Sequence, residues 1–134
     1  MMSLAKVIKT DYEWKRQLTS AQYNVCRKEG TEPPFSGEYL NCKDKGIYKC
    51  VCCGNNLFSS DTKFDSGTGW PSFWAQIKTE SVSEQADDSM GMIRVEARCN
   101  RCNAHLGHVF DDGPAPTHKR YCINSISLKL VMKT

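Results

Sequence analysis

Two Cys-x-x-Cys pairs constrain the fold of this chain more than any other sequence feature. Cys50 and Cys53 form the first pair, and Cys99 and Cys102 form the second. Each pair can occupy one edge of a tetrahedron from a tight turn, so that four thiolates enclose one structural Zn²⁺. Because such a site is closed to substrate, we expect the metal to hold the fold together. The alternatives are two redox-active pairs or two disulfides.

The composition is that of a single domain with a buried core. The chain has 134 residues, of which 40% are hydrophobic and 25% charged, which suits one globular unit. We place this domain at residues 19–134 and expect the polar residues 1–18 to form a frayed N-terminal extension. Nothing in the sequence indicates a large exposed apolar surface, so we expect a monomer.

The charge and the N-terminal sequence argue against several classes of partner. The formal net charge is +3, and lysines and arginines are interspersed with acids, which argues against nucleic acid. No apolar run approaches the ~18 residues of a membrane span, and the sequence MMSLAKVIKT lacks the apolar region of a secretory signal. Zinc thiolates and a reactive thiol need a reducing intracellular compartment, so we expect a cytoplasmic or mitochondrial protein.

Short apolar segments separated by turns predict a mainly β fold. A short helix is expected within residues 19–30, because Thr19 or Ser20 can cap its start and Gly30 can end it. The acidic, polar segment 78–91 is predicted to be a mobile loop. Strands are expected in the segments GIYKCVCCG, NNLFSS, GMIRVEARC and RYCINSISLKLVM.

Cys122 lies alone in the last of these segments. In a strand over residues 120–130, side chains alternate between faces, so that Arg120, Cys122 and Asn124 share one face. The cation is expected to favour the thiolate and lower the pKa of Cys122, and Asn124 is placed to hold a polar atom beside the sulfur. The plainer interpretation is a buried, inert cysteine. The same face continues into a core stripe formed by Ile126, Leu128 and Leu130.

Two of the three histidines follow the second cysteine pair, in the segment AHLGHVF. His105 and His108 would oppose each other on a strand, but Gly107 allows a bend that redirects one ring. Histidine is the side chain best suited to proton transfer near neutral pH; the alternative is a structural role. His118 falls in a turn and is expected to be solvated. The segment GWPSFW supplies Trp70, whose indole can wall a small apolar pocket or cover the core.

Four long motifs resemble those of the B-type methionine sulfoxide reductases, the peptide-methionine (R)-S-oxide reductases. The motifs are EGTEPPFSGEY, CVCCGNNLFSSDTKFDSGTGWPSFW, RCNRCNAHLGHVFDDGP and KRYCINSISL, in the family's order, and the resemblance runs from Thr19 to Leu130. It implies a fold of two antiparallel sheets with a few short N-terminal helices. It also implies reduction of the R epimer of methionine sulfoxide, free or in proteins, through a cysteine sulfenic acid.

The resemblance implies a role for each motif residue. The implied catalytic residues are Cys122 as nucleophile, His108, His105, Asn124 and Arg120. The implied substrate-binding residues are Trp70 and Phe110. The two cysteine pairs match the zinc-containing subgroup, with Cys50, Cys53, Cys99 and Cys102 as ligands of one Zn²⁺ per chain.

The chain departs from the family pattern at Thr68, where many members have a resolving cysteine. Cys26, Cys42 or Cys52 could resolve the sulfenic acid instead, or thioredoxin or another thiol could reduce it directly. The three cysteines can also be bystanders. Two other classes of protein compete with this interpretation: a zinc-ribbon-like binding module without catalysis, and a thiol–disulfide oxidoreductase that uses its Cys-x-x-Cys pairs.

Overall fold

The computed structural model describes residues 5–88 and 93–132. Among these residues, no helix has the length and the apolar character that crossing a bilayer requires. The helices are α1 (Asp11–Gln17) and α2 (Ser20–Arg27). The strands are β1 (Gly46–Cys50), β2 (Asn56–Ser59), β3 (Lys63–Phe64), β4 (Ser72–Phe73), β5 (Val82–Asp87), β6 (Arg94–Cys99), β7 (His105–Phe110), β8 (Arg120–Ile123) and β9 (Leu128–Met132).

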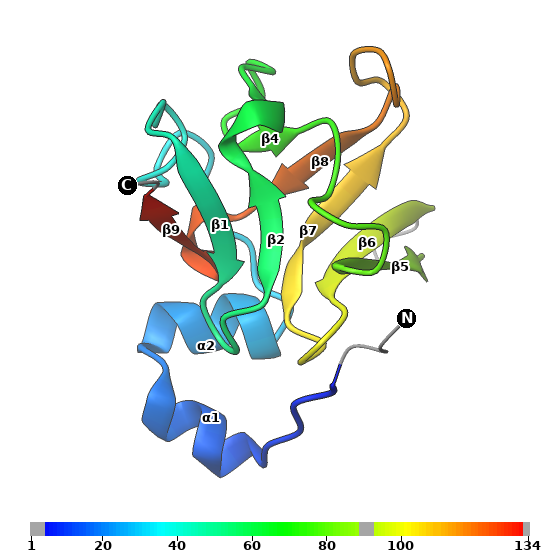
Figure 1. Ribbon diagram of the computed structural model, residues 1–134. Helices are drawn as coiled ribbons and strands as arrows, with labels where there is room; N and C mark the ends of the chain where they lie inside the picture. The colour runs from blue at the N-terminus through cyan, green and yellow to red at the C-terminus, as the bar shows by residue number, and fades with distance from the viewer. Residues whose placement is uncertain (1–4, 89–92, 133–134) are drawn as a thin grey trace.

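The strands form two antiparallel sheets, with both helices at one end of them (Figure 1). The smaller sheet has the strand order β2-β1-β9, and the larger has the order β3-β4-β8-β7-β6-β5. The predicted fold class, mainly β with two antiparallel sheets and short N-terminal helices, is therefore confirmed.

Aromatic side chains join the two sheets. Tyr48 and Phe58 come from the smaller sheet and Phe73 and Tyr121 from the larger one. The rings of Phe58 and Phe73 stack with centroids 4.4 Å apart, and the Tyr48 ring meets the Phe73 ring edge-on at 5.1 Å. Aromatic pairs of this kind contribute about 1 kcal/mol each beyond their buried area. They fix β4 and β8, which frame the site described below.

Helix α2 begins where the sequence predicts. The Thr19 hydroxyl accepts a hydrogen bond from the Gln22 backbone N–H, and the Gln22 side chain accepts one from the Thr19 N–H. This capping box satisfies two of the free donors at the start of a helix. The helix ends at Arg27, earlier than the predicted stop at Gly30.

The N-terminal segment is more ordered than predicted. Fraying was expected throughout residues 1–18, but Asp11–Gln17 forms α1, with a capping box between Thr10 and Glu13. The Trp14 side chain is only 3% exposed, and the Arg27 guanidinium lies 4.3 Å from its ring centroid. One large aromatic residue anchors an otherwise polar helix. The average polarity of residues 1–18 does not reveal such an anchor.

The polar segment 78–91 contains a strand. The prediction of a mobile loop is wrong for Val82–Asp87, which forms β5 and pairs in register with β6 along its whole length. The strand lies at the edge of the larger sheet, where polar side chains discourage pairing with other molecules. Residues 89–91 of the predicted loop lie outside the described residues.

The predicted continuous strand over residues 120–130 is wrong. It is interrupted by a 3-10 turn at Ser125–Ser127, so that β8 belongs to the larger sheet and β9 to the smaller. The Ser127 N–H donates to the Asn124 carbonyl oxygen at 3.0 Å, which closes the turn. Asn and Ser favour such turns because their short polar side chains compete with regular backbone pairing. The predicted common face therefore ends at Asn124 and does not continue to Leu128.

Candidate active site and metal centre

Cys122 lies in a row of polar side chains that crosses the larger sheet. In the pairing of β4 with β8, Ser72 is directly opposite Cys122, and in the pairing of β7 with β8 the opposite residue is His108. Glu96 on β6 is in turn opposite His108. Directly opposite residues of antiparallel strands share a face, with Cβ atoms about 5 Å apart. The register alone therefore places the Cys122 thiol beside the His108 imidazole.

A β-bulge turns both histidines to the same side of the sheet. The pairing of Ala97 with Gly107 is followed by that of Arg98 with His105, which leaves Leu106 as an extra residue in β7. The extra residue cancels the normal alternation, so the rings of His105 and His108 lie with centroids 5.6 Å apart. The predicted redirection of one ring is thus produced by the bulge at Leu106, next to Gly107.

Gly107 is required where β7 meets β8. A Cβ atom at this position would lie 1.9 Å from the Cys122 carbonyl oxygen. Any other residue would push β7 away from β8, and the His108 ring would move away from the thiol with it.

Each histidine contacts a carboxylate. His105 Nδ1 lies 2.5 Å from Glu96 Oε2, and both side chains are 4% exposed. His108 Nε2 lies 2.8 Å from Asp87 Oδ2. Burial lowers the pKa of His105, and the Glu96 carboxylate opposes that shift. These contacts orient the two rings.

Arginines hold the two carboxylates in turn. Arg98 Nε lies 2.9 Å from Glu96 Oε1, and Arg94 Nη2 lies 3.5 Å from Asp87 Oδ2. Buried carboxylates are stable only when they are paired in this way. The charged residues Arg94, Glu96 and Arg98 occupy alternate positions of β6, so one face of this strand supports the histidines.

A small cavity of about 110 Å³ opens beside the Cys122 thiol. Five of the sequence-predicted residues line it: Cys122, His108, Asn124, Trp70 and Phe110. Three residues that were not predicted also line it: Thr31, Arg94 and Gly107. His105 and Arg120 lie outside this lining, but the His105 ring contacts the His108 ring and the Arg120 guanidinium lies over the Phe110 ring.

Asn124 has a different contact from the predicted one. Its Oδ1 accepts a hydrogen bond from the Glu32 N–H at 3.0 Å, and its Nδ2 donates to the Leu106 carbonyl at 3.0 Å. The amide thus ties the segment before β1 to the bulge in β7, rather than holding a polar atom at the sulfur.

Glu32 connects the walls of the cavity. The Glu32 carbonyl oxygen accepts a hydrogen bond from Trp70 Nε1 at 3.0 Å, and its carboxylate accepts one from the Ile126 N–H at 2.9 Å. Its side chain is almost fully buried, with 2% of the residue exposed. Glu32 therefore fixes the indole of Trp70 relative to the turn that follows Cys122.

The prediction that Arg120 lowers the pKa of Cys122 is only half right. Burial has the largest effect and raises the pKa of Cys122 above its ordinary value, while the charge of Arg120 lowers it by less. Arg120 Nε lies 2.8 Å from Asp112 Oδ1, and the guanidinium lies 4.3 Å from the centroid of the Phe110 ring. The Asp112 carboxylate shares the charge of Arg120, which leaves less of it for the thiol.

The four cysteines of the two Cys-x-x-Cys pairs come together at the opposite end of β6. Their Sγ atoms all lie within 4.8 Å of one another, and those of Cys50 and Cys102, and of Cys53 and Cys99, are 3.6 Å apart. A tetrahedron with Zn–S bonds of about 2.3 Å has edges of about 3.8 Å. Asn55 Nδ2 lies 3.7 Å from Cys99 Sγ, a donor suited to a thiolate. The cluster can hold a metal ion.

Comparison with known proteins gives one consistent result. A family model described as the SelR domain matches residues 18–132. A peptide methionine sulfoxide reductase MsrB of Hahella chejuensis is 58% identical over 92% of this chain and 89% of its own length. The protein of that name from Methanosarcina barkeri is 58% identical over 95% of this chain and 89% of its own length. The one from Pseudomonas aeruginosa is 56% identical over 96% of this chain and 97% of its own length.

The chain belongs to the SelR family of methionine sulfoxide reductases. The resemblance drawn from the four motifs is therefore confirmed. Membership also favours an oxidoreductase over the zinc-ribbon-like binding module, and over an enzyme that uses its Cys-x-x-Cys pairs for thiol exchange.

Three cysteines of this SelR domain, Cys26, Cys42 and Cys52, belong neither to the metal-site cluster nor to the lining of the small cavity. Cys26 and Cys52 are 2% and 5% exposed and lie in the core near the metal-site cysteines. Cys42 lines a separate surface hollow with Lys63. Among the described residues, Cys122 is the only cysteine that lines the small cavity.

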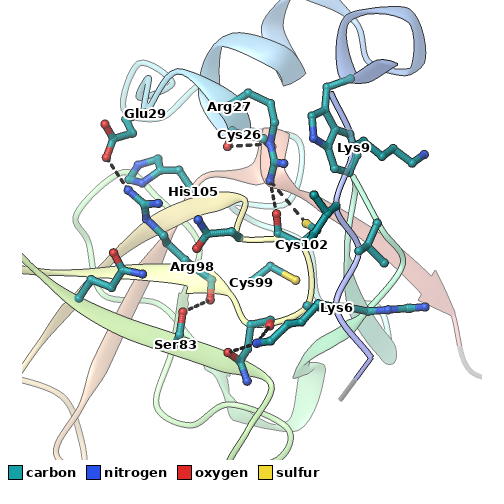
Figure 2. Close-up of a pocket in the computed structure, with 17 residues that line it drawn as sticks. Lys6, Lys9, Cys26, Arg27, Glu29, Ser83, Arg98, Cys99, Cys102 and His105 are labelled. Atoms are coloured by element: carbon teal, nitrogen blue, oxygen red, sulfur yellow. Dashed lines mark hydrogen bonds and ion pairs between the residues drawn. The ribbon is translucent and has the colours of Figure 1, made fainter. Parts of the chain in front are cut away.

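A second, larger cavity of about 690 Å³ lies between the N-terminal segment, β6 and the metal-site cysteines of this SelR domain (Figure 2). His105, Cys99 and Cys102 line it together with several basic side chains. Arg27 Nη2 donates to the Cys102 carbonyl at 2.9 Å and lies 3.6 Å from Cys102 Sγ. The basic side chains of this lining would offset the negative charge of metal-bound thiolates.

The sequence motifs of the SelR family did not reveal the partners of the candidate catalytic side chains. Asp87 was assigned to a loop, and Glu32 and Glu96 had no assigned role. A signal for Glu96 was present, because Arg94, Glu96 and Arg98 alternate with Val95 and Ala97 in a predicted strand. Three charged residues on one face of a central strand indicate a polar site rather than a core.

Proposed function

We propose that this chain reduces methionine (R)-sulfoxide, free or within proteins, with Cys122 as the nucleophile. The Cys122 thiolate attacks the sulfoxide sulfur, and His108, supported by His105, supplies protons to the sulfoxide oxygen. The oxygen ends on Cys122 as a sulfenic acid, so the cysteine sulfur is oxidised and the substrate sulfur is reduced to the thioether. The observation that carries this proposal is the pairing of Cys122 with His108 beside the small cavity.

The cavity suits the methyl end of the substrate. Trp70 and Phe110 supply apolar walls, and the Glu32 carbonyl holds the Trp70 indole in place. A volume of about 110 Å³ accommodates a few heavy atoms. Shape at these walls would select the R epimer, because the S epimer exchanges the positions of the methyl group and the oxygen.

We propose that the metal is one structural Zn²⁺ per chain, held by Cys50, Cys53, Cys99 and Cys102. The ion would join the turn after β1 to the turn between β6 and β7. It would thereby fix the start of β7, which carries both histidines. It takes no part in the proposed chemistry.

We propose that thioredoxin or another thiol reduces the sulfenic acid directly. Cys26 and Cys52 are buried near the metal-site cysteines, and Cys42 lines a different hollow, so none of them is placed to attack Cys122. This cycle and the zinc thiolates both require a reducing intracellular compartment, cytoplasmic or mitochondrial.

The proposal is tested by Cys122→Ser, with Cys42→Ser as the matched control. The Cys122 variant is expected to lose all turnover of (R)-sulfoxide while keeping its zinc content and its thermal unfolding midpoint, and the control is expected to keep its activity. Substantial turnover by Cys122→Ser would overturn the assignment of the nucleophile. Equal turnover of the S epimer by the wild-type chain would overturn the assignment of the substrate.

The mass of the intact chain tests the route of regeneration. After one equivalent of (R)-sulfoxide without reductant, we expect a gain of one oxygen, located on Cys122 by peptide mapping. A loss of two hydrogens instead would mean a disulfide, and the peptide map would then identify Cys26, Cys42 or Cys52 as the resolving cysteine.

A further inference from the structure

Three hydroxyl groups form a hydrogen-bonded chain beside the Cys122 thiol. Ser66 Oγ lies 2.7 Å from Ser72 Oγ and 2.8 Å from Thr68 Oγ1. Ser72 is the residue directly opposite Cys122 in the pairing of β4 with β8. Thr68 Oγ1 is at the other end of the chain, where the Thr68 hydroxyl acts on the Cys122 thiol and opposes the rise in the pKa of Cys122.

The loop that carries Thr68 is held in one conformation. Gly67 and Gly69, on either side of Thr68, both have positive φ angles, which other residues rarely adopt. The Gly67 N–H donates to Asp65 Oδ1 at 3.1 Å, and the Phe35 N–H donates to the Gly69 carbonyl at 2.7 Å. A Cβ atom at Gly69 would lie 2.7 Å from Pro34 Cβ, so this loop is packed against its neighbours. The Thr68 hydroxyl is therefore aimed by the backbone.

The direction of the chain follows from its far end. The Ser72 hydroxyl donates to the Trp70 carbonyl at 3.2 Å, and a carbonyl can only accept. Ser72 has a single hydrogen, so Ser66 must donate to Ser72 and Thr68 must donate to Ser66. The Thr68 oxygen is then left to accept the hydrogen of the neutral Cys122 thiol.

Loss of the thiol proton reverses this order. A thiolate can only accept, so the Thr68 hydroxyl must rotate and donate to the sulfur. Ser66 can then donate to Thr68, and Ser72 to Ser66, by rotation about single bonds and without movement of heavy atoms. Hydrogen bonds to a charged acceptor are about twice as strong as neutral ones. The reversal gives up the Ser72 bond to the Trp70 carbonyl but places a charge-assisted bond on the sulfur, so the chain favours the thiolate over the thiol.

We propose that Thr68 is a catalytic residue, whose hydroxyl donates to the Cys122 thiolate at the end of a reversible chain formed with Ser66 and Ser72. Its contribution to turnover rests on the function proposed above, whereas its effect on the thiol does not. The hydroxyl counteracts the burial that disfavours the thiolate of Cys122. This gives a chemical use to the position at which many family members carry a resolving cysteine.

The test compares Thr68→Val, which removes the hydroxyl from a side chain of the same shape, with Thr68→Ser, which keeps it. The readout is the rate at which iodoacetamide alkylates Cys122 in the zinc-loaded full chain, followed by peptide mass spectrometry between pH 6 and pH 10. At neutral pH we expect Thr68→Val to be alkylated about tenfold more slowly than wild type. We expect its pH profile to move upward, and we expect Thr68→Ser to stay close to wild type.

Two further variants guard against an indirect effect. Thr79→Val changes an exposed threonine away from the site and is expected to alkylate like wild type. Ser66→Ala interrupts the chain one step from Thr68 and is expected to slow alkylation by a smaller factor than Thr68→Val does. It tests the chain independently of whether Thr68→Val folds. Wild-type alkylation profiles for both Thr68→Val and Ser66→Ala would overturn the proposal. Because alkylation needs no sulfoxide, failure of sulfoxide turnover in the wild-type chain would count against the proposed function and not against Thr68.

Discussion

At the scale of single residues, the site is a balance between burial and charge. The half-buried Cys122 thiol loses hydration, which raises its pKa, and Arg120 recovers only part of the loss because Asp112 holds its guanidinium. A thiol that is mostly protonated when no substrate is present resists adventitious oxidation, since the thiolate is the reactive form. We infer that the protein keeps Cys122 unreactive until a sulfoxide occupies the cavity.

This balance predicts a steep pH dependence of Cys122 alkylation. Because the pKa of Cys122 lies above its ordinary value, the thiolate fraction should rise about tenfold for each pH unit between pH 7 and pH 9. Arg120→Met removes the nearby cation, so its pKa should rise further and its alkylation at pH 8 should be slower. Arg16→Met, on the exposed face of α1, is the control. Faster alkylation of the Arg120 variant would contradict the sign of this effect.

A second prediction concerns the carboxylate behind His105. The Glu96 charge raises the pKa of His105 against the effect of burial, so Glu96→Gln should lower that pKa further. A smaller fraction of His105 is then protonated at any given pH. We expect kcat/KM for (R)-sulfoxide to fall roughly 10- to 100-fold and its pH optimum to move downward. Glu84→Gln, on the exposed part of β5, should change kcat/KM less than about twofold. An unchanged optimum in the Glu96 variant would exclude this role for the carboxylate.

At the scale of secondary-structure elements, the sequence was informative where a motif or a cap was local. The start of α2 follows from Thr19, and the metal cluster follows from the spacing of the cysteines. The break after Asn124 was not predicted, because the sequence alternates as a strand would even at the residues where the backbone turns. The bulge at Leu106 and the edge strand β5 were missed because each depends on the neighbouring strand. Partners supplied by other strands, such as Asp87 for His108, cannot be found from local patterns.

Helix α1 provides a test at this scale. Trp14 is its one buried side chain and packs against the guanidinium of Arg27. Trp14→Ala should lower the free energy of unfolding by about 3 kcal/mol, measured by urea denaturation. Tyr12→Ala, on the same helix but 67% exposed, should lower it by less than about 0.5 kcal/mol. Equal effects of the two substitutions would mean that the segment before residue 19 is an appendage, as the sequence had suggested.

At the scale of the whole molecule, the metal centre and the active site occupy opposite ends of the same strands. Cys99 is the last residue of β6, Cys102 lies in the turn that follows, and β7 then carries His105 and His108. Disorder at the metal end would therefore reach the histidines within a few residues. The proposed zinc thus supports catalysis only through the position of β7.

Removal of the metal tests this coupling. We expect one Zn²⁺ per chain, and we expect a strong chelator to abolish both sulfoxide turnover and the cooperative thermal transition, because structural zinc contributes directly to folding. Cys99→Ser should reproduce both effects, with Cys42→Ser as a control that keeps its zinc. A metal-free chain with an unchanged thermal transition would show that the cysteine cluster does not stabilise the fold.

The position of β8 has a consequence for how the enzyme meets its reductant. The strand lies between β4 and β7 in the interior of the larger sheet (Figure 1), and an interior strand does not fray or swing outward. In the proposed cycle, oxidised Cys122 therefore stays where the reaction leaves it, and the donor thiol must travel to it. We expect the rate at which a donor reduces Cys122 to depend on how far its thiol projects and how narrow the surroundings of that thiol are. A small or protruding thiol should then succeed where a more strongly reducing but recessed thiol fails.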